Sequence, residues 1–348
     1  MEKVVHGSDL ARVAFDPELS IGARNAVRTC LRIRPAEKVT LITDHASLEI
    51  GASLFHEVRE VTPRCTAFVL EDCAPRPLEN LPEPILEDLE SSQVSLFAVT
   101  AQTNELKSRM QMTRVVHRHR IRHAHMVNIN HRIMLEGMRA DYNEVDAVSN
   151  KVCELARGAS VVRARTAAGT DLTVRLNPEY RWIKTSGIIQ PEKWGNLPGG
   201  EVFTTPDEVN GAYVIDGVVG DYLGDKYGLL RQQPLTVRIR ENRLTEVFSE
   251  NKALEQEFWK YCHTDENSDR VGEFAIGTNI ALGEVIGHIL QDEKVPGVHI
   301  AFGNPYGEHT GAEWTSSSHI DVVGSRFDLW LDDRQIMESG QFLLSTGK

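Results

Sequence analysis

The 348-residue chain has no long apolar run and few cysteines. No segment approaches the roughly 20 apolar residues of a membrane-spanning helix, and the N-terminal 20 residues lack the apolar stretch of a secretory signal. The cysteines number five and include no CxxC pair, so neither a disulfide framework nor a zinc ribbon is indicated. These absences predict a cytoplasmic protein with reduced thiols and no membrane attachment.

Basic residues are also in short supply. Lys and Arg total 38 against 50 Asp and Glu, a formal net charge of −12. A chain of this sign is repelled by a phosphate backbone unless its basic residues cluster, so nucleic acid is not an expected partner. The N-terminal half contains neither GxGxxG nor GxxxxGK[ST], the two common phosphate-binding signatures of α/β folds. A nucleotide-dependent enzyme is therefore disfavoured.

What the chain does contain is ample core material: 41% of its residues are hydrophobic and 25% are charged. A length of about twice the typical 150-residue domain predicts two domains. Residues 1–157 alternate strand-like and helix-like segments, which predicts an α/β domain built on a parallel sheet. The expected strands are 38–43, 65–71, 94–101 and 125–130, and the expected helices are 47–61, 86–92, 104–120 and 141–156.

After Gly158 the pattern changes to hairpins. Alternating runs flank short turns in 160–176, 235–250 and 327–342, which predicts a mostly β (α+β) second domain over 158–348. Glycine and proline are dense between Gly187 and Gly228, a composition typical of long loops. Because functional residues often lie on loops held by a rigid frame, we expect a site near these loops.

Metal-ligating residue types occur at several places in the second half. His319 and Asp321 are two residues apart in a strand-like run, so they point to the same face. The alternative for such a short motif is a polar pair at a strand end. His299 also occupies an apolar, strand-like run, where a histidine satisfied within the core is the alternative.

Two glutamates accompany these residues. Glu273 lies in an apolar segment, where burial of a carboxylate requires a cation or hydrogen-bond donors. Glu201 follows a glycine-rich turn; a surface residue at the start of a strand is its simpler interpretation. Together the carboxylates and imidazoles suit Zn²⁺, Mn²⁺ or Co²⁺, and they suffice for two ions.

In order, the segments GGEVFTTP, VGEFAIGTN, GVHIAFGNPY and SSSHIDVVG resemble the four ligand segments of the M29 metalloaminopeptidases, the aminopeptidase T and aminopeptidase S type. The N-terminal segment ARNAVRTCLRIRPAEKVTLITD is similar to the opening helix and strand of that family. The resemblance implies a dimeric exopeptidase with an N-terminal α/β domain and a C-terminal metal domain that holds two divalent ions.

Carried over residue by residue, the resemblance implies metal ligation by five side chains and a substrate contact by one more. Tyr306 would hydrogen-bond the tetrahedral intermediate, and Glu201 is the candidate general base. The predicted reaction is hydrolysis of an amide or peptide bond next to a free amine in a small molecule or short peptide, by a water that two metal ions activate. The implied ligands are Glu201, Glu273, His299, His319 and Asp321.

The sequence also resembles 2,5-dihydroxypyridine dioxygenases in its length and in the HxD segment. Those enzymes use one ferrous ion held by two histidines and an aspartate. His299, His319 and Asp321 satisfy that ligand rule, so a mononuclear Fe(II) ring-cleaving dioxygenase is the alternative function. In the dioxygenases, however, the position of Glu273 is a histidine and the position of His299 carries none. The residues at both positions favour the peptidase.

Two further segments are weaker candidates. The stretch 112–132 is rich in Arg and His, and a solvated helix face is its expected role; His117, His119, His123 and His125 are not counted as ligands. The segment Asp292-Glu293-Lys294 precedes the His299 strand and is expected either to hold a ligand in place or to form a plain turn.

Overall fold

The computed structural model describes residues 10–191 and 195–344. Part of the N-terminal 20 residues, for which no secretory signal was predicted, lies outside the described residues. The chain divides into two compact units. Unit 1 runs to Asn143 and includes Gly187–Gly199, and unit 2 contains Glu144–Ser186 and the chain from Gly200 onward. None of the helices in the described ranges has the length and apolar character needed to span a bilayer.

This division differs from the predicted boundary at residues 157 and 158 in two segments. The last predicted helix of the first domain, α7 (Tyr142–Arg157), buries Val148, Val152 and Ala156 in the core of unit 2. The segment Gly187–Gly199 returns to unit 1, where β8 (Gly195–Asn196) pairs with β4. The unit to which each segment belongs is thus set by the residues it packs against and not by its position along the chain.

Unit 1 is built on the predicted parallel sheet. Its strand order is β2-β1-β3-β4-β8, and the recorded strand pairs are all parallel. Every residue of β1 and β3 is buried, which explains why these strands read as continuous apolar runs: helices and loops cover both faces of the sheet. The strands are β1 (Val39–Thr43), β2 (Cys65–Val69), β3 (Val94–Val99) and β4 (Arg122–Val127).

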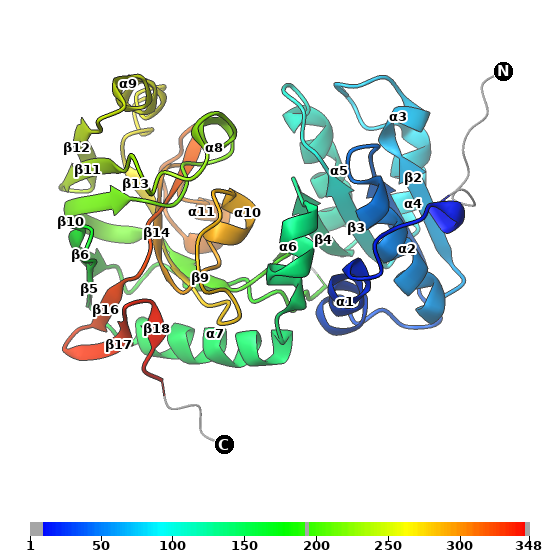
Figure 1. Ribbon diagram of the computed structural model, residues 1–348, viewed down its shortest axis with the longest axis horizontal. Helices are drawn as coiled ribbons and strands as arrows, with labels where there is room; N and C mark the ends of the chain where they lie inside the picture. Colours follow the sequence, from blue (N-terminus) through cyan, green and yellow to red (C-terminus); the bar gives the residue numbers. More distant parts are fainter. Residues whose placement is uncertain (1–9, 192–194, 345–348) are drawn as a thin grey trace. The chain divides into compact units, whose positions relative to one another are not determined.

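The helices of unit 1 flank this sheet (Figure 1). Side chains of α4 and α5 form one hydrophobic cluster with Ile42, Phe97 and Val99 from the strands. The helical segments are η1 (Leu10–Arg12), α1 (Leu19–Arg24), η2 (Asn25–Cys30), α2 (Leu48–Val61), α3 (Leu70–Cys73), α4 (Glu83–Glu90), α5 (Leu106–Arg118), α6 (His131–Leu135) and η3 (Gly137–Arg139).

The His-rich stretch is only partly the solvated helix face that we expected. His117 and His119 are exposed at the end of α5, but β4 begins at Arg122, so His123 lies inside the sheet and is fully buried. Its Nδ1 lies 2.8 Å from the hydroxyl of Ser95 on the neighbouring strand, and its Nε2 lies 3.2 Å from Nδ1 of His125. The sequence pattern did not predict a strand at Arg122 and His123, because polar residues can be buried in a strand when they find hydrogen-bond partners.

We expect the buried His123 to make unit 1 sensitive to acid. Burial lowers the pKa of His123 to about 3, whereas an unfolded histidine titrates near 6.5. Below about pH 6.5 the unfolded chain therefore binds a proton that the folded chain excludes, and the free energy of unfolding falls by about 1.4 kcal/mol per pH unit. The measurement is denaturant unfolding at several pH values between 7.5 and 4.5.

The His123→Gln variant should have a shallower pH dependence than the wild type. Replacement of the exposed His119 by glutamine is the matched control and should leave the slope unchanged. An equal slope in the wild type and the His123→Gln variant would show that His123 is not the acid-sensitive group.

Unit 2 contains two antiparallel sheets and confirms the predicted hairpins. In the hairpin of β11 and β12, Glu241 and Asn242 both have positive φ angles, 50° and 67°, as a two-residue type I′ turn requires. The larger sheet, sheet B, has the order β12-β11-β10-β6-β5-β16-β17-β18. Its strands are β5 (Val161–Arg165), β6 (Asp171–Leu176), β10 (Pro206–Ile215), β11 (Leu235–Arg240), β12 (Arg243–Phe248), β16 (Asp328–Leu331), β17 (Arg334–Glu338) and β18 (Gln341–Phe342).

The smaller sheet, sheet C, has the order β15-β14-β13-β9-β7. One of its faces contributes Phe274, Ile300 and Val322 to a core that it shares with residues of sheet B and with α7 and α9. The remaining elements are β7 (Ile183–Lys184), β9 (Glu201–Thr204), β13 (Val271–Gly277), β14 (Gly297–Gly303), β15 (His319–Val323), α8 (Tyr222–Tyr227), α9 (Lys252–Tyr261), α10 (Ile289–Asp292) and α11 (Gly307–Thr310).

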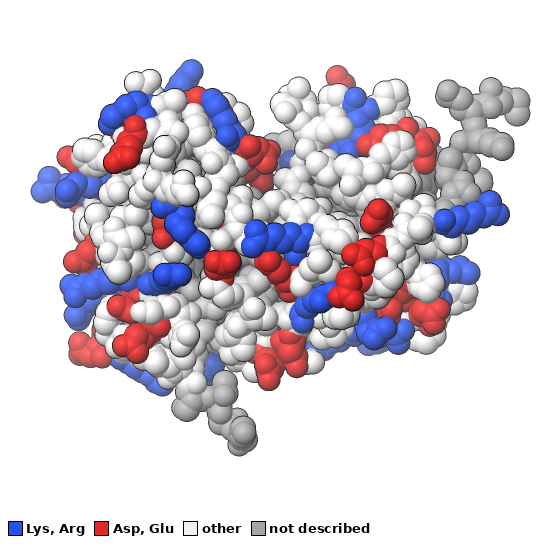
Figure 2. Space-filling model, viewed as in Figure 1, with Lys and Arg blue, Asp and Glu red and all other residues white. Residues whose placement is uncertain are grey.

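Acidic and basic side chains are interspersed on the face of the molecule shown in Figure 2. Within the area in view they do not gather into a broad basic patch, which agrees with the excess of acidic residues in the composition.

Candidate metal centre

Four adjacent strands of sheet C carry the five residues predicted as ligands, and the strand register places all five on one face. Ala301 lies opposite both Glu273 and Asp321, and Ala275 lies opposite His299. Side chains alternate between the two faces of a sheet, so residues two apart on one strand point to the same face. Residues that lie opposite each other on neighbouring strands also share a face. The apolar residues that alternate with these polar residues along the strands point to the opposite face, into the core. The alternation thus places the core on one face of sheet C and the site on the other.

Small residues fill the positions between these polar side chains. Ala301 stands between Glu273 and Asp321, and Gly277 lies opposite Glu201. A larger side chain at Ala301 would lie between these two carboxylates, and a Cβ on Gly277 would lie 2.0 Å from the carbonyl oxygen of Val295. Gly277 therefore lets the backbone of Lys294 and Val295 pack closely against sheet C beside Glu201.

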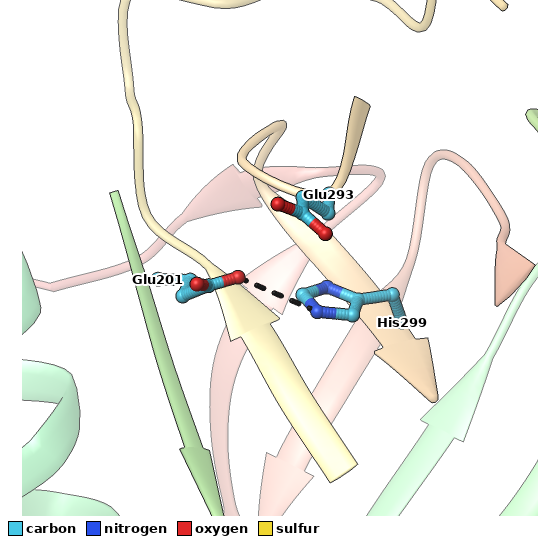
Figure 3. Close-up of side chains that lie close together, drawn as sticks. All are labelled: Glu201, Glu293 and His299. Carbon is cyan, nitrogen blue, oxygen red and sulfur yellow. Dashed lines mark ion pairs between the residues drawn. The ribbon is translucent and has the colours of Figure 1, made fainter. Parts of the chain in front are cut away.

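The first group of possible ligands, which we name cluster 1, consists of Glu201, Glu293 and His299. Their candidate ligand atoms all lie within 4.8 Å of one another. Figure 3 shows the carboxylate of Glu201 directed at the ring of His299, and the recorded distance from Oε2 to Nε2 is 3.5 Å. Glu293 approaches the same ring from the end of α10.

Cluster 1 also contains a fully buried lysine. The Nζ of Lys294 lies 2.7 Å from Oε1 of Glu201 and 2.6 Å from Oε1 of Glu293. Burial opposes ionisation of Glu201, but Lys294 and His299 hold its pKa below the ordinary value. Burial raises the pKa of Glu293 to about 8, although Lys294 acts in the opposite direction. Glu201 is therefore a carboxylate at neutral pH.

The second group, cluster 2, consists of Glu273, His319 and Asp321, which satisfy the same 4.8 Å criterion. Nε2 of His319 lies 3.3 Å from Oδ1 of Asp321 and 3.8 Å from Oε2 of Glu273. Burial opposes protonation of His319, but Asp321 and Glu273 raise its pKa to about 10. Without a metal the imidazole thus carries a proton, which a bound divalent cation would replace.

His299 joins the two clusters and provides a test of whether the site fits a metal. Its Nε2 is buried without a hydrogen-bond partner of normal length. The nearest acceptors are Oε1 of Glu273 at 3.4 Å and Oε2 of Glu201 at 3.5 Å, one from each cluster. A buried imidazole nitrogen aimed between carboxylates has the chemistry of a metal ligand, so the donor set fits divalent cations.

Backbone contacts orient His319. Its Nδ1 lies 2.8 Å from the carbonyl oxygen of Asn304, which directs Nε2 toward the carboxylates. The serine segment before β15 is anchored by Asp265, which accepts hydrogen bonds from the side chains of Ser316 and Ser317 and from the backbone N–H of Ser317. These donors, Ser317 foremost, lower the pKa of Asp265. These hydrogen bonds therefore hold the serine segment in one position next to the site.

Tyr306 lies beside cluster 2. Its ring centroid is 4.4 Å from that of His319, and its φ angle is +49°. The residue as a whole is 40% exposed. Desolvation and the negative charges of Asp321 and Glu273 raise the pKa of the hydroxyl, which keeps it a hydrogen-bond donor.

The structure thus brings together all five predicted ligands and places Tyr306 next to them. It also puts Glu293 in cluster 1 as a possible ligand, where the sequence pattern indicated at most a supporting role or a turn. The available signal was the acidic pair Asp292-Glu293 just before the His299 strand. Asp292 accepts hydrogen bonds from the backbone N–H groups of residues 286–288, so its neighbour Glu293 is left to face the site.

The thermophilic metalloprotease family (M29) matches residues 132–325. Two solved structures share the fold over almost the whole chain. Wild-type AmpT from Thermus thermophilus is 18% identical, with a TM-score of 0.69, and the match covers 95% of this chain and 100% of AmpT. The 2,5-dihydroxypyridine dioxygenase from Pseudomonas putida KT2440 is 14% identical, with a TM-score of 0.68 and coverage of 94% and 97%. A comparison with curated proteins finds no match.

Proposed function

The chain belongs to the M29 family of thermophilic metalloproteases, and from this membership we propose that it is an aminopeptidase-like hydrolase. Its substrate would be a small molecule or short peptide, cut at the amide bond next to a free amine. The observation that carries the proposal is the buried Nε2 of His299, which lies 3.4 to 3.5 Å from carboxylate oxygens of two different clusters.

Clusters 1 and 2 would each hold one divalent ion, Zn²⁺, Co²⁺ or Mn²⁺. Nitrogen and carboxylate ligands of this kind suit all three metals. When bound, such ions supply Lewis acidity and a water molecule that is acidic near neutral pH. The proposed ligands are Glu201, Glu293 and His299 in cluster 1 and Glu273, His319 and Asp321 in cluster 2.

The protein's own side chains would orient the substrate and move protons. Tyr306 would donate its hydroxyl proton in a hydrogen bond to the oxygen that becomes negatively charged as the carbonyl carbon turns tetrahedral. Glu201, an ionised carboxylate inside the site, would accept the proton of the attacking water. The free amine of the substrate would lie among the carboxylates, which would limit cleavage to the amino end.

We also propose a homodimer and a cytoplasmic location. The support for the dimer is the resemblance to M29 aminopeptidases, and the support for the location is the low number and wide spacing of the cysteines.

The experiment is metal analysis of protein purified without added ions, followed by assays on aminoacyl anilides with Zn²⁺, Co²⁺ and Mn²⁺. The proposal predicts about two bound divalent ions per chain at saturation and release of the anilide. Substrates whose amine is acetylated should not be cleaved. Tight metal binding without cleavage of any free-amine substrate would overturn the assignment as an aminopeptidase.

The alternative function is that of a ring-cleaving Fe(II) dioxygenase, for which the similar fold of the Pseudomonas enzyme is the support. That chemistry would need His299, His319 and Asp321 around one iron. In this chain each cluster contains a single histidine, and so we favour the hydrolase. Oxygen consumption with a dihydroxylated ring and one bound iron per chain would reverse this choice.

A further inference from the structure

Lys294 lies within a proposed metal-binding cluster although its own charge is positive. We infer that its ammonium group acts as an internal cation in cluster 1, so that two divalent ions load unequally: the first enters cluster 2, and the second enters cluster 1 only by displacing Lys294. This inference rests on the proposed function, and it adds an order of metal binding that the ligand residues alone do not define.

The contacts of Lys294 are those of a cation bound by ligands. Its Nζ lies 2.7 Å from Oε1 of Glu201 and 2.6 Å from Oε1 of Glu293, and the side chain is completely buried. The hydroxyl of Thr185 donates to the same Oε1 of Glu201 at 2.7 Å. One oxygen of each carboxylate is therefore already occupied by a positive charge, and a metal ion must compete for it.

The two clusters differ in the cationic side chain that contacts their carboxylates. In cluster 1 the carboxylates of Glu201 and Glu293 share one ammonium group. In cluster 2 the structure records no ion pair of Glu273 or Asp321 with a lysine or arginine within the described ranges, and their recorded partners are histidines. An incoming divalent cation thus competes with a lysine ammonium group for the carboxylates of cluster 1, and it meets no such competitor in cluster 2 within the described ranges.

The position of Lys294 is built into the backbone. Its carbonyl oxygen accepts a hydrogen bond from the N–H of Asn279 at 2.9 Å. Asp292, two residues earlier, is buried and accepts hydrogen bonds of 2.7 to 3.1 Å from the three successive backbone N–H groups of residues 286–288. These hydrogen bonds fix the turn that carries Glu293 and Lys294, and the turn directs Lys294 into cluster 1.

The test is the stoichiometry and affinity of Zn²⁺ binding, measured by equilibrium dialysis in metal buffers for the wild type and the Lys294→Met variant. Methionine keeps the length of the side chain and removes its charge. We expect the wild type to bind a first ion on the order of 100-fold or more tightly than a second, because a unit charge at ion-pair distance strongly changes cation binding in a protein interior. In the variant the second ion should bind at least about tenfold more tightly than in the wild type.

Thermal unfolding supplies a readout that is independent of activity. Without metal, the variant removes the cation that Glu201 and Glu293 share, so its melting temperature should lie below that of the wild type and should rise more on addition of Zn²⁺. The Lys294→Gln variant, which retains a hydrogen-bond donor, is the second variant if methionine prevents folding. Lys226→Met, which removes an exposed ion pair with Glu257, is the control and should change neither affinity.

Two equal affinities in the wild type, or a second affinity that Lys294→Met leaves unchanged, would overturn the inference. A single ion in the wild type and two in the variant would support it. Failure of the proposed function is distinguishable, since it would appear as a wild-type chain that binds no divalent metal or that binds metal and cleaves no free-amine substrate.

Discussion

Replacing Glu273 with glutamine should lower the affinity for divalent metal by more than about 100-fold, beyond the 10–100-fold typical of residues that only support a ligand. Turnover should be lost with the metal. The reason is the central position of this carboxylate: its oxygens lie 3.4 Å from Nε2 of His299 and 3.8 Å from Nε2 of His319, so it faces both imidazoles. The measurements are metal content after dialysis and kcat/KM on an aminoacyl anilide.

Glu273 is buried, so a substitution at this position should keep the shape of its side chain. The desolvated carboxylate has a raised pKa, and glutamine has nearly the same shape without the charge. Glu246→Gln, at an exposed position of β12, is the matched control and should retain both metal and activity. A Glu273→Gln enzyme that keeps its metal and its kcat would remove this residue from the site.

The same variant separates the two candidate reactions. In a hydrolase that uses both clusters, Glu273→Gln and His319→Ala should be similarly damaging. In an iron dioxygenase built on His299, His319 and Asp321, the loss of His319 should be far more damaging than the loss of Glu273.

Replacing Tyr306 with phenylalanine should lower kcat by about 10²- to 10³-fold, the loss typical of removing one hydrogen-bond donor to a developing oxyanion. KM should change little, because an interaction made only in the transition state does not contribute to substrate binding. The phenyl ring can keep the contact with His319, whose centroid lies 4.4 Å away, so the metal content should be unchanged. Steady-state kinetics together with metal analysis check this result.

Tyr222→Phe, at a residue that is 61% exposed in α8, is the control for a lost hydroxyl elsewhere in unit 2. A Tyr306→Phe enzyme that is impaired only in KM would assign the tyrosine to substrate binding. An enzyme that also loses metal would assign it to support of His319.

The fold was predictable wherever the local pattern and the tertiary environment agree. The alternation of strand-like and helix-like segments predicted the parallel sheet, and the runs at residues 39–43 and 94–99 form strands in which every residue is buried. The turn Glu241-Asn242 adopts the conformation expected of a two-residue hairpin. The prediction was less accurate at β4, whose first residues are Arg122 and His123, because polar strand residues that find hydrogen-bond partners leave no apolar signal.

Most of the candidate site was also visible in the sequence, because its ligands lie on strands. The alternation in His319-Ile320-Asp321 puts two polar groups on one face and an apolar one in the core, and the structure shows this arrangement. Glu293 and Lys294 carry no such periodic signal, since they follow a four-residue helix in a turn whose direction is fixed by hydrogen bonds to Asp292.

By itself, the sequence determined the fold class and placed five polar residues in strand-like runs, because alternation and composition are properties of neighbouring residues. That these five residues act together was implied by the resemblance to the M29 family and not by their spacing. Only the tertiary structure decided which residues oppose one another across sheet C, that Glu293 joins Glu201 and His299, and that the ammonium group of a buried lysine contacts two carboxylates of cluster 1. These features depend on strand order and register between segments about a hundred residues apart, and no local pattern encodes the distance between charges that meet only after folding.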